Sequence, residues 1–300
     1  MEMAPWRGVL VATALPFHAD QGIDFGAYAA HVGWLADNGC HGVVPNGSLG
    51  EYQALSSEER ASVVRTAVQA APDGFAVVPG VSAYGADEAR RWTEQAAEEG
   101  CPAVMLLPPT TYRADEAAVL AHYREVAKAG LPIVAYNNPM DTRVDLTPDL
   151  LRRLHDEGLI VAVKEFSGDA RRAYQIAETA PGLDILAGAD DVALEFLIAG
   201  AVGWIGGYQN AIPASCVRLY EAATAGDLRT AVLLYRALHP LLRWDSRTEF
   251  VQAIKLSMDV AGRPGGFTRS RASRWPPPTP RVIRTTTERV ARGQGTADAQ

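Results

Sequence analysis

The sequence predicts a (β/α)8 barrel, or TIM barrel, followed by a C-terminal helical extension. Eight short apolar segments alternate with amphipathic segments over residues 8–205, which is the repeating pattern of that fold. No G-x-G-x-x-G follows the first apolar segment, whereas a doubly wound open sheet, the alternative, usually carries that fingerprint. The sixth apolar segment ends in Lys164, at the edge where such barrels place their active sites.

Local signals mark the boundaries of the predicted elements. The helix over 24–38 stops at Gly39, a C-cap, and the helix over 57–71 opens with Ser56 followed by Glu59, a capping signal. The predicted strands are 8–13, 41–46, 75–79, 102–107, 132–136, 159–166, 183–187 and 201–205. The other helices between them are 86–99, 115–129, 147–157, 169–179 and 190–199.

The chain divides into a barrel over 1–212, C-terminal helices over 213–262 and an Arg/Pro-rich tail over 263–300. We expect the C-terminal helices to pack against the barrel or another subunit; they are predicted over 213–225, 227–242 and 247–260. The tail holds eight arginines and two acidic residues without aromatic or periodic organisation. A solvated, poorly ordered terminus is therefore favoured over a segment that binds nucleic acid or a membrane.

Composition excludes several classes of function. A formal net charge of -7 gives no overall basic surface, so we expect no nucleic-acid partner. The three cysteines form no C-x-x-C pair and the histidines no H-E-x-x-H, so we expect no disulfide framework, metal or cofactor. Neither a signal peptide nor a membrane span is indicated, and the expected location is the cytoplasm.

Lys164 is the residue around which a catalytic hypothesis forms. Burying an ammonium group costs several kcal/mol unless it is paired or neutralised. A desolvated lysine loses its proton more easily, and the neutral amine attacks ketones to form a Schiff base. Arginine supplies every basic side chain except Lys128, Lys164 and Lys255, which suggests that an amine able to deprotonate is needed here. The structural alternatives are a snorkelling side chain and an ion pair with Glu165.

Two further groups fall on the predicted catalytic edge. Tyr136 ends the strand before the lysine strand, where a phenol can move protons. Taken alone, the residue is better explained as an ordinary core tyrosine with its hydroxyl at the wet end. The turn Gly47-Ser48-Leu49-Gly50 presents successive backbone N–H groups and one hydroxyl, an arrangement that suits a carboxylate. Glycine turns are common, so this turn alone identifies no ligand.

Four segments together carry a specific signature. They are Gly47-Ser48-Leu49-Gly50-Glu51, Tyr136-Asn137-Asn138-Pro139, Val163-Lys164-Glu165-Phe166-Ser167-Gly168-Asp169 and Gly203-Trp204-Ile205-Gly206-Gly207. In this order and spacing they resemble the dihydrodipicolinate synthase / N-acetylneuraminate lyase family of class I aldolases over residues 6–262. The resemblance implies a (β/α)8 barrel, usually assembled as a homotetramer from two dimers, that acts on small 2-oxo acids.

The resemblance also implies roles for individual residues. Lys164 is the Schiff-base lysine, and Tyr136 is the proton-relay tyrosine. The residues that hold the carboxylate of the 2-oxo acid are Gly47, Ser48 and Leu49, and Ile205 lines the site with its carbonyl near the lysine.

Three positions depart from the synthase pattern of that family. Leu49 stands where a second hydroxyl residue is usual, and Thr111 stands near the position of a tyrosine that reaches a partner subunit's site. Asp141 stands where synthases carry an arginine for the carboxylate of their second substrate. An acid at that position disfavours aspartate semialdehyde as a substrate.

One subgroup is similar in more segments, namely the 1-pyrroline-4-hydroxy-2-carboxylate deaminases of hydroxyproline degradation. The shared runs are Pro45–Glu51, Pro108-Pro109, Tyr112–Glu116, Tyr136–Pro139 and Phe250–Leu256. This similarity implies that Lys164 attacks C2 of a cyclic imine to yield 2-oxoglutarate semialdehyde and ammonia. The alternatives are 4-hydroxy-tetrahydrodipicolinate synthase, an aldolase or dehydratase of 2-keto-3-deoxy sugar acids, and a non-catalytic barrel that binds 2-oxo acids.

Overall fold

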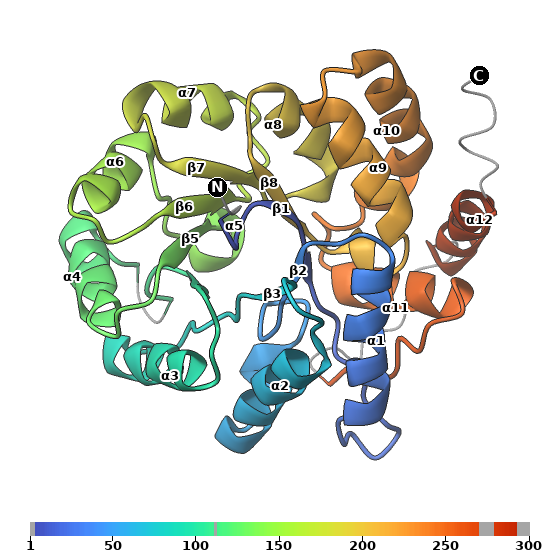
Figure 1. The fold of residues 1–300 in the computed structure, drawn as a ribbon, viewed down its shortest axis with the longest axis horizontal. Helices are drawn as coiled ribbons and strands as arrows, with labels where there is room; N and C mark the ends of the chain where they lie inside the picture. Colours follow the sequence, from blue (N-terminus) through green and yellow to red (C-terminus); the bar gives the residue numbers. More distant parts are fainter. Residues whose placement is uncertain (1–3, 111–112, 270–278, 293–300) are drawn as a thin grey trace.

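The fold is an eight-stranded parallel barrel in the computed structural model, which describes residues 4–110, 113–269 and 279–292 (Figure 1). The strand order within these ranges is β3-β2-β1-β8-β7-β6-β5-β4, with helices around the outside. Gly80, just after β3, pairs with Met105 of β4 and closes the ring. Met105 N–H donates to the Pro79 carbonyl at 2.9 Å across this seam. The predicted (β/α)8 barrel is confirmed.

The strands are short and buried, as parallel strands covered on both faces must be. They are β1 (Gly8–Ala12), β2 (Gly42–Val44), β3 (Ala76–Val77), β4 (Val104–Leu106), β5 (Ile133–Asn137), β6 (Ala162–Glu165), β7 (Asp184–Ala187) and β8 (Gly203–Gly206). The barrel helices are α1 (Phe25–Asp37), α2 (Ser57–Ala70), α3 (Ala86–Glu98), α4 (Glu116–Ala127), α5 (Pro139–Thr142), α6 (Pro148–Asp156), α7 (Arg171–Thr179) and α8 (Ala193–Ile198). Single 3₁₀ turns are η1 (Tyr52–Ala54), η2 (Asp190–Val192) and η3 (Tyr208–Asn210).

Alternation along the strands divides the core into two layers. Val9 and Val11 of β1 pack under the helices, whereas Leu10 and Ala12 face the barrel interior. The same alternation on β6 places Ala162 inside and Val163 outside. Successive side chains on a strand point to opposite faces, so position 164 belongs to the interior. This is why the lysine of β6 points into the barrel.

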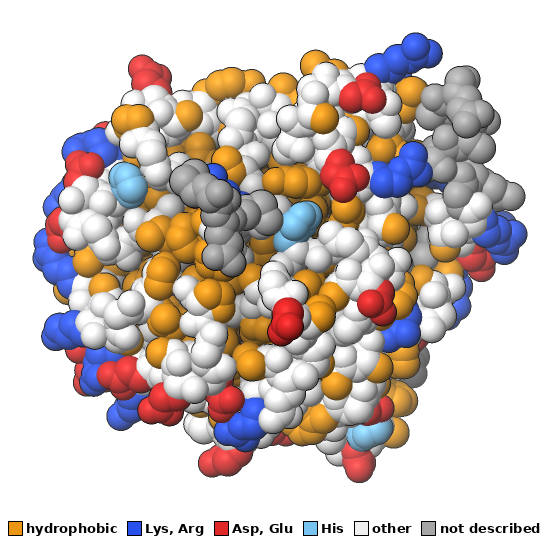
Figure 2. Space-filling view, in the orientation of Figure 1, with side chains coloured by type: hydrophobic (Ala, Val, Ile, Leu, Met, Phe, Trp, Pro, Cys, Tyr) orange, Lys and Arg blue, Asp and Glu red, His pale blue; other side chains and the backbone are white. Residues whose placement is uncertain are grey.

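Within the described ranges, the helices after the barrel are α9 (Pro213–Thr224), α10 (Leu228–Leu242), α11 (Phe250–Val260) and α12 (Thr279–Ala291). The helix predicted from 247 begins at Phe250 instead, and residues 243–249 form turns. Across the described ranges, every helix is too short or too polar to cross a bilayer. On the face shown in Figure 2, acidic and basic side chains are interspersed around the edge and apolar side chains gather nearer the middle.

The expectation of a poorly ordered tail is wrong for residues 279–292, which contain α12 packed on α11 and α10. Ile283, Thr287 and Val290 are buried there, at helical spacing, so one apolar stripe docks the helix despite its arginines. Arg269 is also fixed, with its guanidinium 2.7 Å from the carboxylate of Glu59. Residues 270–278 and 293–300 lie outside the described part of the chain.

Docking of α12 predicts that Ile283→Ala lowers the free energy of unfolding by about 2–4 kcal/mol, because truncating a buried isoleucine loses apolar contact and leaves a cavity. Ile283 is 0% exposed in the folded chain. The matched control is Val282→Ala on the same turn, which is 38% exposed and should change stability little. Urea unfolding of both variants measures this, and equal stabilities would show that α12 does not dock.

Candidate active site

Lys164 lies inside the carboxyl-terminal end of the barrel with an almost fully buried side chain, 4% exposed. The β5–β6 register sets Tyr136 directly opposite Lys164. Lys164 Nζ lies 4.2 Å from the centroid of the Tyr136 ring and 5.6 Å from that of Phe166. Among the described residues Lys164 forms no ion pair, so aromatic faces rather than a carboxylate surround its amine.

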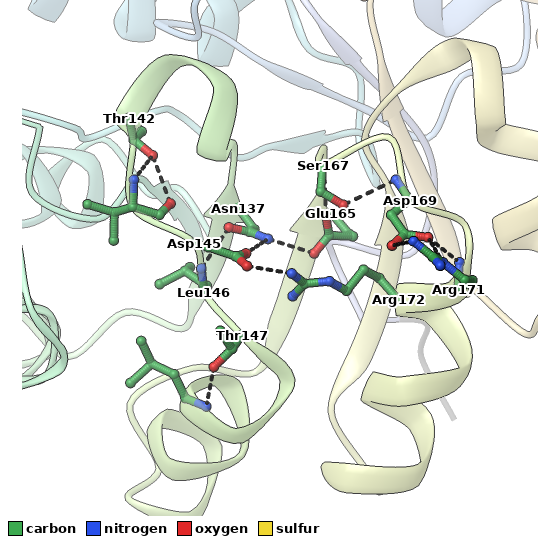
Figure 3. Close-up of polar contacts among 12 residues, drawn as sticks. Asn137, Thr142, Asp145, Leu146, Thr147, Glu165, Ser167, Asp169, Arg171 and Arg172 are labelled. Carbon is green, nitrogen blue, oxygen red and sulfur yellow. Dashed lines mark hydrogen bonds and ion pairs between the residues drawn. The ribbon is translucent and has the colours of Figure 1, made fainter. Parts of the chain in front are cut away.

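Glu165 follows Lys164 on β6, so its side chain points to the opposite face of the strand. There it is bound by Asn137 and Ser167 (Figure 3). Asn137 Nδ2 donates to Glu165 Oε2 at 2.8 Å, and the Ser167 N–H donates to Glu165 Oε1 at 2.7 Å. Asn137 also contacts Asp145, which is ion-paired with Arg172. These contacts exclude the ion pair considered from the sequence and fix the ends of β5 and β6 next to each other.

The environment of Lys164 favours its neutral form. Burial lowers the pKa of Lys164 to about 8, while the carboxyl groups of Asp245 and Asp190 act in the opposite direction. An ordinary lysine titrates near 10.4, so at pH 7 the neutral fraction rises from well under one in a thousand to about one in ten. An amine with this pKa can act as a nucleophile at physiological pH.

A cavity of about 410 Å³ opens at this end of the barrel. It brings together six residues predicted from the sequence, namely Gly47, Ser48, Leu49, Tyr136, Asp141 and Lys164. Ile205 is fully buried in the barrel interior and does not line the cavity, although the next residue, Gly206, does. Thr111 lies outside the described residues.

The turn after β2 forms part of the cavity wall. Left-handed residues flank it, with Asn46 at φ 56° and Glu51 at φ 53°. Glu51 is 1% exposed, and its Oε1 accepts from Lys255 Nζ of α11 at 2.9 Å. Lys255 therefore anchors this turn. The turn presents Ser48 and Leu49 to the cavity, with the Ser48 side chain half-buried.

Asn138 connects Tyr136 to Asp141 at the mouth of the cavity. Its Nδ2 donates to the Tyr136 hydroxyl oxygen at 3.2 Å and to Asp141 Oδ2 at 2.9 Å. Burial raises the pKa of Tyr136 well above its usual value, and the Asp245 carboxyl adds to this. The phenol is therefore protonated at neutral pH, and it can donate a proton or pass one on.

Two aspartates near Lys164 were missed by the sequence analysis. Asp190 follows β7 and is fully buried, so its place just beyond a strand end was a usable signal. Asp245 belongs to the 243–249 turn and lines the cavity. Its Oδ2 accepts the Asp190 N–H at 3.2 Å. No spacing rule connects a residue on that turn to a strand end.

The described residues contain no cluster of three or more His, Cys, Asp or Glu side chains suited to a metal ion.

Comparisons with known proteins agree with this geometry. Residues 5–273 match the Dihydrodipicolinate synthetase family. The chain belongs to this family. A relative named 4-hydroxy-tetrahydrodipicolinate synthase, from Methanosphaerula palustris, is 33% identical over 242 residues, covering 79% of this chain and 83% of the relative. The protein is therefore a class I aldolase-like lyase.

Two solved structures of the family superpose closely. The 4-hydroxy-tetrahydrodipicolinate synthase of Methylacidiphilum fumariolicum SolV is 28% identical with a TM-score of 0.91, over 98% of each chain. A prophage protein of the family from E. coli K12, solved in complex with pyruvate, is 26% identical with a TM-score of 0.88, over 95% of this chain and 98% of that one.

Close packing at Gly188 predicts that Gly188→Ala disrupts the lysine strand. An added Cβ would approach the Glu165 carbonyl oxygen to 2.5 Å and Lys164 Cγ to 3.1 Å. We expect a loss of about 1–3 kcal/mol in stability together with slower reaction of Lys164. The control is Gly33→Ala in α1, where an added Cβ meets nothing within 4 Å. Unfolding curves of both variants test this, and a fully stable Gly188→Ala protein would contradict it.

Proposed function

We propose that this lyase is a 1-pyrroline-4-hydroxy-2-carboxylate deaminase that works through a Schiff base on Lys164. The observation that carries the Schiff base is a buried amine with a pKa near 8, lining a cavity beside a protonated phenol. The pyruvate bound in the E. coli relative supports a 2-oxo acid or related imino acid as the ligand class. Asp141 at the mouth disfavours a second, anionic substrate.

In the proposed reaction the carboxylate of the substrate binds the N–H groups of the Ser48–Leu49 turn. The neutral amine of Lys164 attacks C2 of the cyclic imine, and Tyr136 moves protons to and from the ring nitrogen and C3. The ring opens, the 4-hydroxyl leaves as water, and hydrolysis releases ammonia and 2-oxoglutarate semialdehyde. A single bound substrate suffices for each of these steps, so no site for a second acid is required.

The second candidate is 4-hydroxy-tetrahydrodipicolinate synthase. Its support is the name of the Methanosphaerula palustris relative together with Arg247, an exposed cation on the rim of the cavity. That guanidinium, stacked 5.1 Å from the ring centroid of Trp244, offers a positive charge for a second carboxylate that Asp141 does not. The choice between the two functions depends on which of these two charges acts on the substrate.

We also propose that the enzyme is a cytoplasmic homotetramer, as the family resemblance implies.

Reductive trapping tests the Schiff base. Incubation with pyruvate and borohydride should add covalent mass to the peptide that contains Lys164, because the reduced imine is stable. The adduct should be absent from Lys164→Ala and unchanged in Lys128→Ala, whose amine is exposed. Peptide mass spectrometry locates the adduct, and an adduct at Lys128 or Lys255 would overturn the site assignment.

The pH dependence of trapping follows from the lowered pKa of Lys164. Only the deprotonated amine attacks, so the initial trapping rate should rise about tenfold per pH unit below pH 8 and level off above it. Cyanoborohydride trapping between about pH 6 and pH 10 measures this. A rate that continues to rise toward pH 10 would indicate an ordinary, solvated lysine.

A paired assay tests the substrate. Purified protein receives 1-pyrroline-4-hydroxy-2-carboxylate in one reaction, and pyruvate with aspartate semialdehyde in another. We expect ammonia in the first and little condensation in the second, because Asp141 repels the second carboxylate. Lys164→Ala should abolish either activity. Dominant condensation would establish the synthase, and failure of both reactions would make a 2-keto-3-deoxy sugar acid the next substrate to assay.

A further inference from the structure

Asp245 reaches the cavity from outside the barrel, on the 243–249 turn between α10 and α11. Its side chain is buried, 7% exposed. Oδ2 accepts the Asp190 N–H at 3.2 Å, while Oδ1 lies over Gly207, where an added Cβ would come within 2.8 Å of it. Gly207 itself lines the cavity, so one oxygen of Asp245 is anchored and the other lies at the cavity wall.

Of the two carboxyl groups, those of Asp190 and Asp245, the Asp190 group is the better placed to hold a negative charge. Its Oδ1 accepts from Trp204 Nε1 at 2.9 Å, and its Oδ2 accepts from the N–H groups of Gly207 and Tyr208 at 3.1 and 2.8 Å. Within the described residues, Asp245 accepts one backbone hydrogen bond in place of these three. Two carboxyl groups that repel each other electrostatically do not both ionise readily, so the proton belongs to the less well solvated Asp245.

The pKa shifts of Asp245 and Asp190 agree with this placement of the proton. Burial raises the pKa of Asp245 well above its usual value, and the neighbouring Asp190 raises it further. The pKa of Asp190 is raised only to about 6, because its three N–H donors oppose the effect of burial. Of the two carboxyl groups, Asp245 is therefore the one that more readily holds a proton.

We propose that Asp245 is the general acid that protonates the departing 4-hydroxyl group of the substrate, a role that rests on the proposed function. Tyr136 becomes a phenolate when it protonates the departing ring nitrogen. Once C2 is an iminium on Lys164, this phenolate takes a proton from C3 and leaves an enamine. The enamine nitrogen pair re-forms the C=N bond, and the C2–C3 π pair becomes the C3–C4 double bond. The C4–O bond then breaks toward oxygen, which takes the Asp245 proton and leaves as water. Tyr136 keeps the C3 proton and is a neutral phenol again, while Asp245 regains its proton from solvent.

A separate acid is needed at this step because hydroxide is a poor leaving group and Tyr136 is already occupied. In the proposed reaction the phenol handles protons at C3 and at the imine, and its hydroxyl oxygen is held by Asn138. A carboxylic acid is also the stronger donor, since phenols titrate several units higher. The same acid would serve a 2-keto-3-deoxy sugar acid, which carries its hydroxyl at the same carbon.

Leaving-group dependence in Asp245→Asn tests the proposal. The variant receives the 4-hydroxy substrate and its 4-chloro analogue, and ammonia release is measured for both. Chloride departs without a proton, so only the hydroxy substrate should slow by about 10²–10⁴, with the chloro analogue slowed less than about tenfold. The ratio of the two rates does not depend on the fraction of folded protein. Pyruvate trapping on Lys164 should persist.

Asp191→Asn is the matched control. Asp191 Oδ1 accepts at 2.6 Å from the Oγ of Ser246, which lies on the same turn as Asp245, but Asp191 itself does not line the cavity. Both of its rates should stay near those of the wild type. Equal slowing of both substrates in Asp245→Asn, or slowing of neither, overturns the role of Asp245 alone. Wild-type protein that releases no ammonia from the hydroxy substrate refutes the proposed function, and the role of Asp245 falls with it.

Discussion

Desolvation of the Lys164 amine is the constraint on which the rest of the site depends. Removing an ammonium group from water is costly, and here the two nearest carboxyl groups only partly offset that cost, so the pKa falls rather than rises. A direct ion pair would have reversed the outcome. Glu165 is adjacent in sequence, yet the period-two alternation of β6 directs it to Asn137 and Ser167 on the other face. The strand geometry thus keeps the carboxylate of the adjacent residue away from the amine.

Most of the fold and the centre of the site could be predicted from the sequence, because both depend on local patterns. Strand alternation and the family-like segments identified Lys164, Tyr136 and the turn after β2, and the parallel register brings them together at one end of the barrel. Asp245 could not be predicted in this way. Periodicity extended the last predicted helix back to residue 247, whereas the chain turns until Phe250 and carries Asp245 into the cavity.

The prediction for the C-terminal tail differed from the structure for another reason. It relied on amino-acid composition and passed over the apolar periodicity of α12. Arginine and proline content suggested a solvated terminus, but Ile283, Thr287 and Val290 recur at helical spacing and are buried against neighbouring helices. A narrow apolar stripe is enough when a partner surface exists, and that surface is formed by α10 and α11, which the tail sequence does not reveal. Charge on the outer face of such a helix carries no information about whether its inner face docks.

In the proposed reaction, the elements that carry the chemistry differ from those that select the substrate. Lys164 and Tyr136 are strand residues whose positions are fixed by register, so relatives that keep the barrel can keep the Schiff base. Asp141 lies on the single turn of α5, while Asp245 and Arg247 lie on the 243–249 turn. Substitutions there change the charge around the substrate without moving a strand. The names of relatives about one-third identical are therefore strong evidence for the reaction class and weak evidence for the substrate.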